Sequence, residues 1–320
     1  MIAERYVRFA RTEAAGRSPL YEKLAHHVAS SSVCLRFLEQ LPPDRQQPNL
    51  LFGAVRLVTG TPTSPEALDG ALLAHGGAIA AIMLSRTTQT NEPARCAALL
   101  PALARIEDPI ALIEVGASAG LCLLPEYYGY DWGRQRLDPS MTDDGVFPIF
   151  ECTASETTPL PTHFPDIVWR AGLDLNPLDV TKSEDMAWLE ALVWPEHHLR
   201  LERLRAAMRI ARKHPPRLVK GDLTRDLDAL MAQAPQNAAL VIFHTAVLSY
   251  IPHQPLRDDF ARHMLASGAV WLSNESERVF PQFATGSTAP ESGRFLLCRN
   301  GKPLAWTGPH GQSIDWIAPD

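Results

Sequence analysis

The stretch ALIEVGASAGLCLL, residues 111–124, decides how the rest of the chain is interpreted. It opens with a short apolar run that is typical of a buried strand, and it continues into a turn rich in glycine. Residues 116–120, GASAG, fit the G-x-S-x-G elbow that presents a nucleophilic serine in some hydrolases. The same residues also fit a glycine turn that brings the backbone close to a nucleotide-type cofactor. The remainder of the chain has to discriminate between the two interpretations.

The composition is that of an ordinary soluble globular protein. Of the 320 residues, 46% are hydrophobic and 21% are charged, and the net charge at pH 7 is −6. A negative charge gives no general attraction to nucleic acid or to anionic lipid, so neither is an expected partner. Apolar runs such as AALVIF are too short to cross a bilayer, and the first residues lack the apolar core of a secretory signal. We therefore expect a cytoplasmic protein whose partner is a small molecule, and the oligomeric state stays open.

The cysteines and histidines do not form a recognisable metal motif. The five cysteines are scattered without a C-x-x-C pair, which favours reduced thiols over disulfides or a structural zinc site. His26–His27 and His197–His198 are pairs of adjacent residues, whose side chains point about 100° apart on a helix. We interpret both pairs as surface histidines and predict no metal. The cysteines are Cys34, Cys96, Cys122, Cys152 and Cys298.

Residues 1–107 are predicted to form a helical domain without strands. Four segments place apolar residues three and four positions apart, which is the spacing of one helix face. A further helix is expected from Asn91, which can cap it, with Glu92 near its positive end and Pro93 in its first turn. The four segments are ERYVRFARTEA from residue 4, SPLYEKLAHHVA from residue 18, NLLFGAVRLVTG from residue 49 and PEALDGALLAHGGAIAAIMLSR from residue 65.

Over residues 108–320 the pattern changes to strands that alternate with helices. Such alternation predicts an α/β fold with a doubly wound, mostly parallel sheet. Asn300 and Gly301, between two apolar runs, indicate a terminal hairpin that adds antiparallel strands at an edge. Residues 124–168 are expected to be an insertion. The other strands are expected in IALIEV, PDIVWRAGLDLNP, PRLVKGDL, AALVIFHTA and GAVWLSNES.

A serine hydrolase would use Ser118 as its nucleophile. The sequence HGG at residues 75–77 resembles an oxyanion loop, but it falls inside a predicted helix. In the α/β-hydrolase fold the serine follows several strands of the sheet, whereas here no strand is expected before residue 110. Ser118 is therefore better interpreted as a small residue that tightens the turn and caps a following helix. The acid of a triad would be Asp222 or Asp226, and the base His244 or His253.

A cofactor site would use residues at successive strand ends, because the carboxyl ends of parallel strands meet at one edge of a sheet. The second strand ends at Asp174, where a carboxylate can accept hydrogen bonds from ribose hydroxyls. The third strand ends at Asp222, where an amino group of a nucleobase would lie. We therefore predict a ligand site along this edge. Its predicted cofactor-binding residues are Glu114, Gly116, Ser118, Gly120, Asp174 and Asp222.

Longer motifs resemble two known families. IEVGASAG, GLDLNP, KGDL and VIFHTAVLSY are similar to the successive motifs of class I methyltransferases that use S-adenosylmethionine. Nearly the whole chain also resembles a bacterial family catalogued only as a domain of unknown function, through stretches such as TQTNEPAR, EVGASAGL and RAGLDLNPLDV. The first resemblance implies a Rossmann-like, methyltransferase-type domain with S-adenosylmethionine as its cofactor. The second implies a fold and no particular reaction.

The sequence departs from the methyltransferase pattern in three respects. Ser118 stands where a glycine is usual. Asp174 follows Gly120 by 54 residues (174 − 120), whereas the acidic partner of the ribose usually comes about 20 residues on. The insertion at residues 124–168 would account for the longer spacing. The sequence FHTAV replaces the Asp/Asn-Pro-Pro-Tyr-like signature of enzymes that methylate amino groups, which weakens the case for methylation of nucleic acid or protein.

Methyl transfer requires mainly alignment of the reactants, with a base only when the acceptor must lose a proton. His244 and Glu275 lie at strand ends where a substrate would meet the methyl group, so either is a predicted general base. For His244, a hydrogen-bonded structural histidine is an equal alternative. SRTTQTNEPAR from residue 85 would reach the cofactor from the helical domain, or it would only cap a helix with a Glu92–Arg95 ion pair. The predicted substrate-binding residues are Arg86, Gln89, Asn91 and Glu92.

Three functions remain, in order of preference. The first is methyl transfer from S-adenosylmethionine to a small molecule. The second is ligand binding by a Rossmann-like protein that has no catalytic activity. The third is hydrolysis through Ser118.

Overall fold

The computed structural model describes residues 1–139, 145–285 and 289–318. It has helices alone up to residue 109 and a large sheet after it. The predicted α/β class and the helical N-terminal region are therefore confirmed. The sheet is mostly parallel, as expected, and it contains antiparallel strands as well.

The chain forms two compact units, and each combines two separate stretches of sequence. The first unit contains Met1–Thr90 together with Thr181–Arg205, and the second contains Asn91–Val180 together with Ala206–Asp320. This division differs from the expected boundary at residue 107. The difference comes from helices α6 (Cys96–Leu103), α7 (Ser183–Leu192) and the first half of α8 (His198–Lys213).

Helix α6 (Cys96–Leu103) belongs to the second unit, although its apolar pattern placed it in the predicted helical domain. All 8 of its residues are buried. The Trp132 indole, from the segment that follows the first strand, donates a hydrogen bond of 3.0 Å to the Ala97 carbonyl. An apolar pattern predicts that a helix exists but not which element buries it, so the sequence could not place this boundary.

The first unit is built from helices. Helix α7 (Ser183–Leu192), from the second stretch of sequence, joins this unit through the fully buried Trp188. A β-carbon at Gly53 would lie 3.2 Å from the Trp188 ring, so the glycine allows close packing of the two helices. The other helices are α1 (Ile2–Phe9), a π-helical segment (Ala10–Ala14), α2 (Pro19–Val28), α3 (Ser32–Glu39), α4 (Pro48–Thr59) and α5 (Pro65–Ser85).

Helix α5 contains the HGG sequence of residues 75–77 and bends at His75, whose φ of −128° and ψ of 17° are not helical. The prediction that HGG lies inside a helix is confirmed. Within the described ranges, α5 alone is long and apolar enough to cross a membrane, and 22% of the relevant window is buried. This corrects the expectation that every apolar stretch is too short. The sequence does not contain a continuous aliphatic run here, because alanine and glycine make up much of the segment.

The second unit is centred on a 9-stranded sheet. From one edge to the other its strands are β5 (Thr153–Ala154), β12 (Ser313–Trp316), β11 (Lys302–Thr307), β10 (Phe295–Arg299), β9 (Val270–Ser276), β8 (Ala239–Thr245), β1 (Ile110–Val115), β6 (Ile167–Asp174) and β7 (Arg217–Lys220). Strands β9, β8, β1, β6 and β7 are parallel to one another. The predicted hairpin at Asn300 and Gly301 is present, but β12 and β5 lie beyond it, so the hairpin is not the edge.

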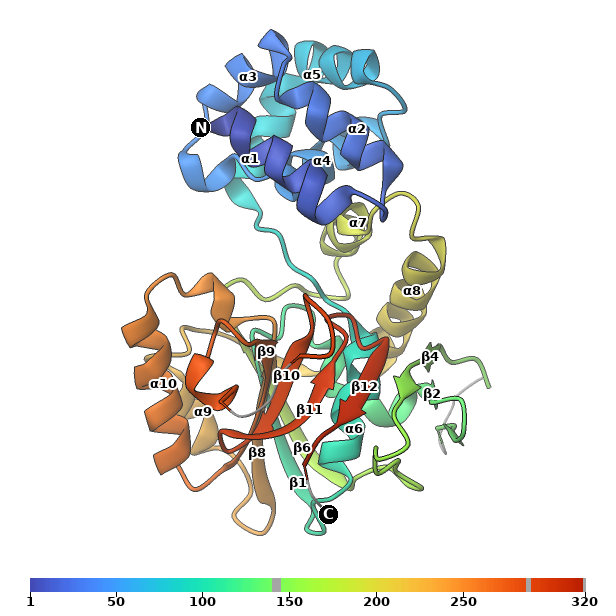
Figure 1. The fold of residues 1–320 in the computed structure, drawn as a ribbon, viewed down its shortest axis with the longest axis vertical. Coiled ribbons are helices and arrows are strands. Elements are labelled where there is room, and N and C mark those ends of the chain that lie inside the picture. The colour runs from blue at the N-terminus through green and yellow to red at the C-terminus, as the bar shows by residue number, and fades with distance from the viewer. Residues whose placement is uncertain (140–144, 286–288, 319–320) are drawn as a thin grey trace. The chain divides into compact units, whose positions relative to one another are not determined.

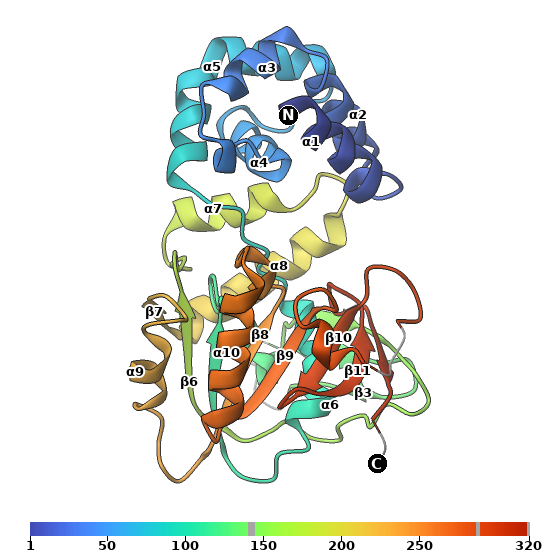
Figure 2. The ribbon, with the colours of Figure 1, turned by 60° about the vertical axis from the view of Figure 1, so that its left-hand side comes forward.

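Helices cover both faces of this sheet. Helices α9 (Leu227–Met231) and α10 (Gln254–Ala266) lie on one face, against apolar side chains of β1, β8 and β9 (Figure 1). Helix α6 lies on the opposite face (Figure 1). Figure 2 shows α10 running alongside β8 and β9. The remaining helix is α8 (His198–Lys213), which precedes β7.

The connection from β1 to β6 contains no α-helix among its described residues. A helix was predicted to begin near Ser118, and this prediction is wrong. Gly116, Ser118 and Gly120 have φ values of 74°, 51° and 70°, and only a 3₁₀ turn, Leu121–Leu123, follows them. An α-helix needs consecutive residues in the right-handed region, so alternating left-handed residues exclude it. Ser118 consequently caps no helix.

The insertion at residues 124–168 forms a small sheet in the strand order β3-β2-β4 and then extends the main sheet. Its last strand, β5, pairs with β12 at the edge. Residues 140–144 of the predicted insertion lie outside the described residues. The small sheet consists of β2 (Gly129–Asp131), β3 (Arg136–Leu137) and β4 (Ile149–Glu151).

Candidate functional site

The carboxyl ends of the central strands carry polar side chains on two opposite faces of the sheet. Side chains alternate along a strand, and the register of β1 with β6 places Asp174 on the same face as Glu114. The register of β1 with β8 places His244 on the opposite face, and that of β8 with β9 places Glu275 with His244. The sequence suggested one edge for Glu114, Asp174, Asp222 and His244, and the structure places His244 on the face opposite to Glu114 and Asp174.

Glu114 is a buried carboxyl group in the central strand β1. The residue is 5% exposed, and no donor among the described residues reaches its Oε2. Burial raises the pKa of Glu114 well above its ordinary value, Cys122 and the Asp174 carboxylate raise it further, and Arg95 opposes them. Burial therefore favours the neutral form of the carboxyl group, which can donate a hydrogen bond. A carboxylic acid kept neutral by burial is suited to recognising an acceptor atom of a ligand.

Asp174, the last residue of β6, ties two loops together. Its Oδ2 accepts a hydrogen bond of 2.8 Å from the Ser118 amide, and its Oδ1 accepts one of 2.7 Å from the Asn176 amide. The Leu178 amide in turn donates to the Ser118 carbonyl at 3.0 Å. Asp174 therefore fixes the turn after β1 against the loop after β6, at the edge where the ligand was predicted.

The glycine turn is packed closely against the protein itself. A β-carbon at Gly116 would lie 2.4 Å from Val247, and one at Gly120 would lie 2.7 Å from Pro216. The lack of a side chain at these two glycines therefore allows Val247 and Pro216 of neighbouring loops to pack against the turn. Ser118 is 5% exposed, and its hydroxyl has no hydrogen-bond partner among the described residues. The Ser118 hydroxyl is consequently a buried polar group of this turn with unused hydrogen-bonding capacity among the described residues.

The segment before α6 contacts this turn. The Asn91 side-chain amide donates to the Ala117 carbonyl at 3.1 Å. Glu92 Oε1 accepts from the Ala94 amide at 3.3 Å and so caps the 3₁₀ turn Pro93–Arg95. Asn91 was predicted to be the cap, and Glu92 takes this position because Asn91 binds the glycine turn instead. Both residues therefore have a structural contact near the predicted ligand edge.

Arg95 is a residue near the ligand edge whose contacts the sequence did not reveal. It is buried, its Nη1 donates to the Thr245 carbonyl at 3.0 Å, and its Nε donates to the Pro309 carbonyl at 2.9 Å. Next to it, Asn274 donates to Thr245 Oγ1 at 3.4 Å and accepts from Thr307 at 2.7 Å. Arg95 thus holds the end of β8 against a loop near the C-terminus. The one feature of the sequence that could have indicated these contacts is the position of Arg95 directly before helix α6, whose residues are all buried.

Arg86 and Gln89 belong to the first unit, whereas Asn91 and Glu92 belong to the second. Arg86 forms an ion pair with Asp185 of α7, so its guanidinium is engaged within its own unit. Gln89 lies in a segment without helix or strand. The role of Arg86 and Gln89 in binding substrate at the predicted ligand edge stays a prediction.

Asp222 is held in a turn of its own. Its Oδ1 accepts hydrogen bonds of 2.8 Å and 2.7 Å from the amide and the hydroxyl of Thr224. These bonds hold the pKa of Asp222 below its ordinary value. The Asp222 amide donates to Asp226 at 2.6 Å. A local turn therefore accounts for an aspartate at this position.

His244 lies in a buried network on the face of α10. Its Nδ1 is 2.8 Å from Glu275 Oε1, and the Trp271 indole donates to its Nε2 at 3.0 Å. Because an indole N–H can only donate, Nε2 is the acceptor, and Nδ1 carries the proton that is donated to Glu275. Both ring nitrogens are occupied, so this geometry matches the structural alternative for His244 and leaves no free base.

Glu275 fixes the loop after β8. Its Oε1 also accepts from the Val247 amide at 2.9 Å and the Leu248 amide at 3.1 Å. Its Oε2 is buried without a partner among the described residues. Since Ser118 has no hydrogen-bonded base and His244 uses both nitrogens on the other face, the geometry offers no activated serine for hydrolysis.

Two strained backbone positions lie in the loops after β1 and β8. Ser118 has a φ of 51° and Ala246 a φ of 57°. In the described parts of the chain, the other non-glycine residue with a positive φ is Asn300, with 49°, in the hairpin turn. A non-glycine residue in this region costs about 1 kcal/mol or more, and such strain clusters at functional sites.

Comparison with known proteins gives one result. A family model described as an uncharacterized protein conserved in bacteria (DUF2332) matches residues 3–316. No curated protein and no solved structure matches the chain.

Proposed function

The chain belongs to this bacterial family, and from that premise we propose that it is a methyltransferase that uses S-adenosylmethionine and acts on a small molecule. The proposed site lies at the carboxyl ends of β1 and β8, on the face of the sheet that carries Glu114.

The strand order supports this location. Numbered along the chain, the parallel strands β7, β6, β1, β8 and β9 lie in the order third, second, first, fourth and fifth. Rossmann-like sheets have this order, and they bind ligands at the carboxyl ends of the strands where the order reverses. In this chain the order reverses between β1 and β8.

The observation that carries the proposal is a pair of buried polar atoms without partners at this point, Glu114 Oε2 and Ser118 Oγ. Buried polar atoms normally have partners, and leaving one unpaired costs about 1 to 3 kcal/mol. The strained residues Ser118 and Ala246 lie in the same two loops. A nucleoside with an amino-acid tail offers several hydrogen-bonding groups that could satisfy such atoms.

Each residue of the site has a distinct role in the proposal. Glu114 donates a hydrogen bond from its protonated carboxyl group, and the Ser118 hydroxyl donates or accepts one. Asp174 accepts hydrogen bonds from ribose hydroxyls at the end of β6. Asn91 and Arg95 hold the surrounding loops in place.

S-adenosylmethionine supplies an activated methyl group on a sulfonium. The contribution of the chain is alignment of the acceptor and exclusion of water. His244 provides no base, because Trp271 and Glu275 occupy its ring nitrogens. We therefore expect an acceptor that is already nucleophilic near neutral pH.

Binding of S-adenosylmethionine and S-adenosylhomocysteine to the full chain tests the site, by calorimetry together with thermal unfolding. We expect saturable binding to the wild type and at least about tenfold weaker binding to Glu114→Leu, because a hydrogen bond to a ligand is worth about 1.4 kcal/mol or more. Asp222→Asn is the matched control and should keep wild-type affinity, since Asp222 serves its own turn. A folded wild type that shows neither heat nor a raised melting temperature with either ligand contradicts the proposal.

Ligand binding without catalysis is a second function that one observation favours. Val247 and Pro216 occupy the space beside Gly116 and Gly120, so the turn is less open than a nucleotide-binding glycine turn requires. Incubation with methyl-labelled S-adenosylmethionine and a protein-free extract of bacterial small molecules separates the two functions. Label in a small molecule other than S-adenosylmethionine, together with formation of S-adenosylhomocysteine, supports the methyltransferase, and binding without transfer supports the alternative.

A further inference from the structure

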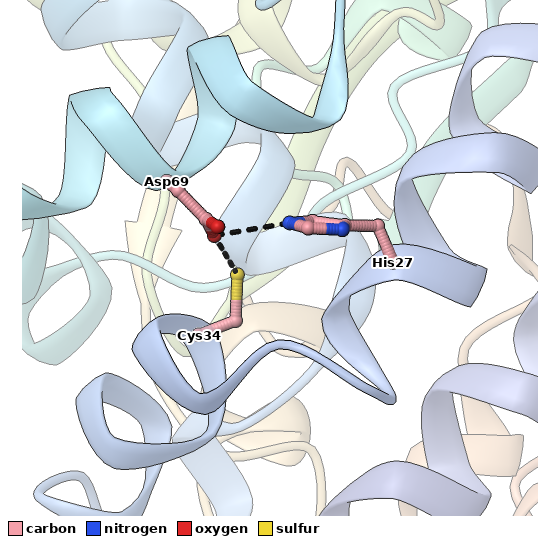
Figure 3. A group of neighbouring side chains, drawn as sticks. All are labelled: His27, Cys34 and Asp69. Atoms are coloured by element: carbon pink, nitrogen blue, oxygen red, sulfur yellow. Dashed lines mark hydrogen bonds and ion pairs between the residues drawn. The ribbon is translucent and has the colours of Figure 1, made fainter.

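Three side chains of the first unit, His27, Cys34 and Asp69, converge on one point (Figure 3). They come from α2, α3 and α5. Asp69 Oδ1 lies 3.0 Å from His27 Nε2 and 3.2 Å from Cys34 Sγ. The three donor atoms all lie within 4.8 Å of one another. Nitrogen, sulfur and oxygen donors are thereby brought together by three different helices.

These separations are close to those around a tetrahedral zinc ion. Zinc binds nitrogen, sulfur and oxygen at about 2.0 to 2.3 Å, which places neighbouring donor atoms about 3.3 to 3.8 Å apart. The two contacts of Asp69 Oδ1 are shorter than this, at 3.0 Å and 3.2 Å. These two contacts would lengthen by a few tenths of an ångström around an ion, and His27 Nε2 and Cys34 Sγ, which lie within 4.8 Å of each other, would move by at most about 1 Å.

A second observation concerns His27. Its Nε2 is buried, lies at ion-pair distance from Asp69 Oδ1 (3.0 Å), and has no geometrically defined hydrogen bond among the described residues. A histidine ring nitrogen that makes no hydrogen bond can coordinate a metal ion while the ring is neutral. The His27 and Asp69 side chains are 24% and 26% exposed, so an ion can enter from solvent.

We propose that His27, Cys34 and Asp69 form a binding site for a divalent transition-metal ion of the zinc class. The ion forms bonds to Nε2, Sγ and a carboxylate oxygen, and the Cys34 proton passes to solvent and leaves a thiolate. A fourth position stays open for water or a ligand. The sulfur and nitrogen donors favour zinc over magnesium or calcium, which prefer oxygen ligands.

Cys34 and Ser31 fit this assignment. The Cys34 thiol donates a hydrogen bond of 3.2 Å to Asp69 Oδ1, so its sulfur lies beside the carboxylate. The Ser31 hydroxyl donates to Asp69 Oδ1 at 2.8 Å and accepts from the Cys34 amide at 3.2 Å. Ser31 thus caps α3 and also orients the carboxylate, as residues behind metal ligands usually do.

The cluster also revises the interpretation of the paired histidines. Adjacent histidines do not chelate one ion, which is why His26–His27 was interpreted as a surface pair. The partners of His27 are instead 7 and 42 residues further along the chain (34 − 27 and 69 − 27), and only the packing of the helices brings them together. His26 is exposed, so the chain supplies a histidine control next to the proposed ligand.

Titration of the metal-free full chain with Co²⁺, followed by absorption, tests the site. We expect one equivalent of Co²⁺ to produce the near-ultraviolet charge-transfer band of a cobalt–thiolate bond, and Zn²⁺ to abolish it by displacement. Cys34→Ser should remove the band. His27→Gln and Asp69→Asn should each weaken Co²⁺ affinity by more than about tenfold, because even residues that only orient a ligand contribute about 10- to 100-fold.

His26→Gln and Cys298→Ser are the matched controls, and both should keep wild-type affinity. The proposal is overturned if the folded wild type shows no thiolate band, or if the band survives Cys34→Ser. If the Cys34 variant does not fold, X-ray absorption of the wild type loaded with Zn²⁺ decides. One sulfur ligand beside nitrogen and oxygen supports the site, and a first shell without sulfur overturns it.

Discussion

At the carboxyl ends of the central strands, buried polar groups have different hydrogen-bonding environments on the two faces of the sheet. On the face of α10, Trp271, His244 and Glu275 form one connected network, and Glu275 Oε1 alone accepts from a ring nitrogen and two backbone amides. On the face of α6, Glu114 Oε2 and the Ser118 hydroxyl meet no partner among the described residues. Glu275 Oε2 also lacks a partner among the described residues, but Glu275 Oε1 holds the loop after β8. On the Glu114 face no such loop contact of the unpaired groups is seen among the described residues, and a ligand could use their hydrogen-bonding capacity.

This difference shows why polar residues at strand ends are ambiguous in a sequence. Phe243 and His244 are neighbours in β8, and the pleat sends their side chains to opposite faces. A residue that looks equally well placed for catalysis can thus belong to the structural network. Four substitutions or measurements, from the largest expected effect to the smallest, test the distinction.

Glu275→Ala should destabilise the protein most. The substitution leaves the His244 ring and two backbone amides without their acceptor, so we expect a loss of about 3 to 5 kcal/mol in the free energy of unfolding. Urea unfolding measures it. Glu275→Gln is the control, since its amide oxygen can accept the same bonds, and it should lose less. A loss below about 1 kcal/mol for the alanine variant would show that the network does not hold the loop.

Glu114→Leu should act in the opposite direction. An apolar side chain of similar size removes a buried carboxyl group whose Oε2 has no partner among the described residues, so we expect a gain of about 1 to 3 kcal/mol in stability at neutral pH. The same variant should lose affinity for S-adenosylmethionine, as expected for a residue kept for function. Urea unfolding and calorimetry on one preparation measure both effects. Destabilisation by Glu114→Leu would mean that Glu114 is structural, like Glu275.

The pH dependence of stability should reveal the charge state of Glu114. Its pKa is raised on folding, so the folded state retains a proton that the unfolded state releases above about pH 4.3. The stability of the wild type should therefore fall, relative to that of Glu114→Gln, as pH rises from there towards the folded-state pKa. The slope in this window should approach about 1.4 kcal/mol per pH unit. Parallel profiles for the two proteins would contradict a raised pKa.

Ser118→Gly should have the smallest effect on stability. Glycine relieves the left-handed strain but gains entropy in the unfolded state, so we expect a change within about 1 kcal/mol. Loss of the hydroxyl should nevertheless weaken binding of S-adenosylhomocysteine. Ala246→Gly is the comparison that relieves strain without removing a polar group. Unchanged affinity in Ser118→Gly would remove Ser118 from the proposed site.

Much of the fold could be predicted from local patterns. The run IALIEV corresponds to β1 without an error in its bounds, and the Asn300–Gly301 turn of the hairpin is where it was expected. The helix after Ser118 could not be excluded from sequence, because residue type does not reveal that Ser118 adopts a positive φ. The short strand β12 was missed, since it depends on pairing with β11 and β5.

The candidate site was predicted in part. Ser118 and Asp174 share a hydrogen bond, and Glu114 lies on the same face as Asp174 in the neighbouring strand, whereas their binding of a cofactor stays a prediction. The bonds of Arg95 to Thr245 and Pro309 could not be foreseen, because they join residues 150 and 214 positions apart. The cluster of His27, Cys34 and Asp69 could not be predicted from the sequence for the same reason, because its members come from separate helices.

The sequence by itself determined the alternation of elements, the positions of most strands and the absence of strands before residue 110. These features follow from the periodicity of apolar residues and from turn-forming residues, which act over a few neighbours. Tertiary structure decided which unit buries α6 and α7, which face receives Glu114 or His244, and which polar atoms remain without partners. Those outcomes depend on register and packing between distant segments, and no local pattern encodes them.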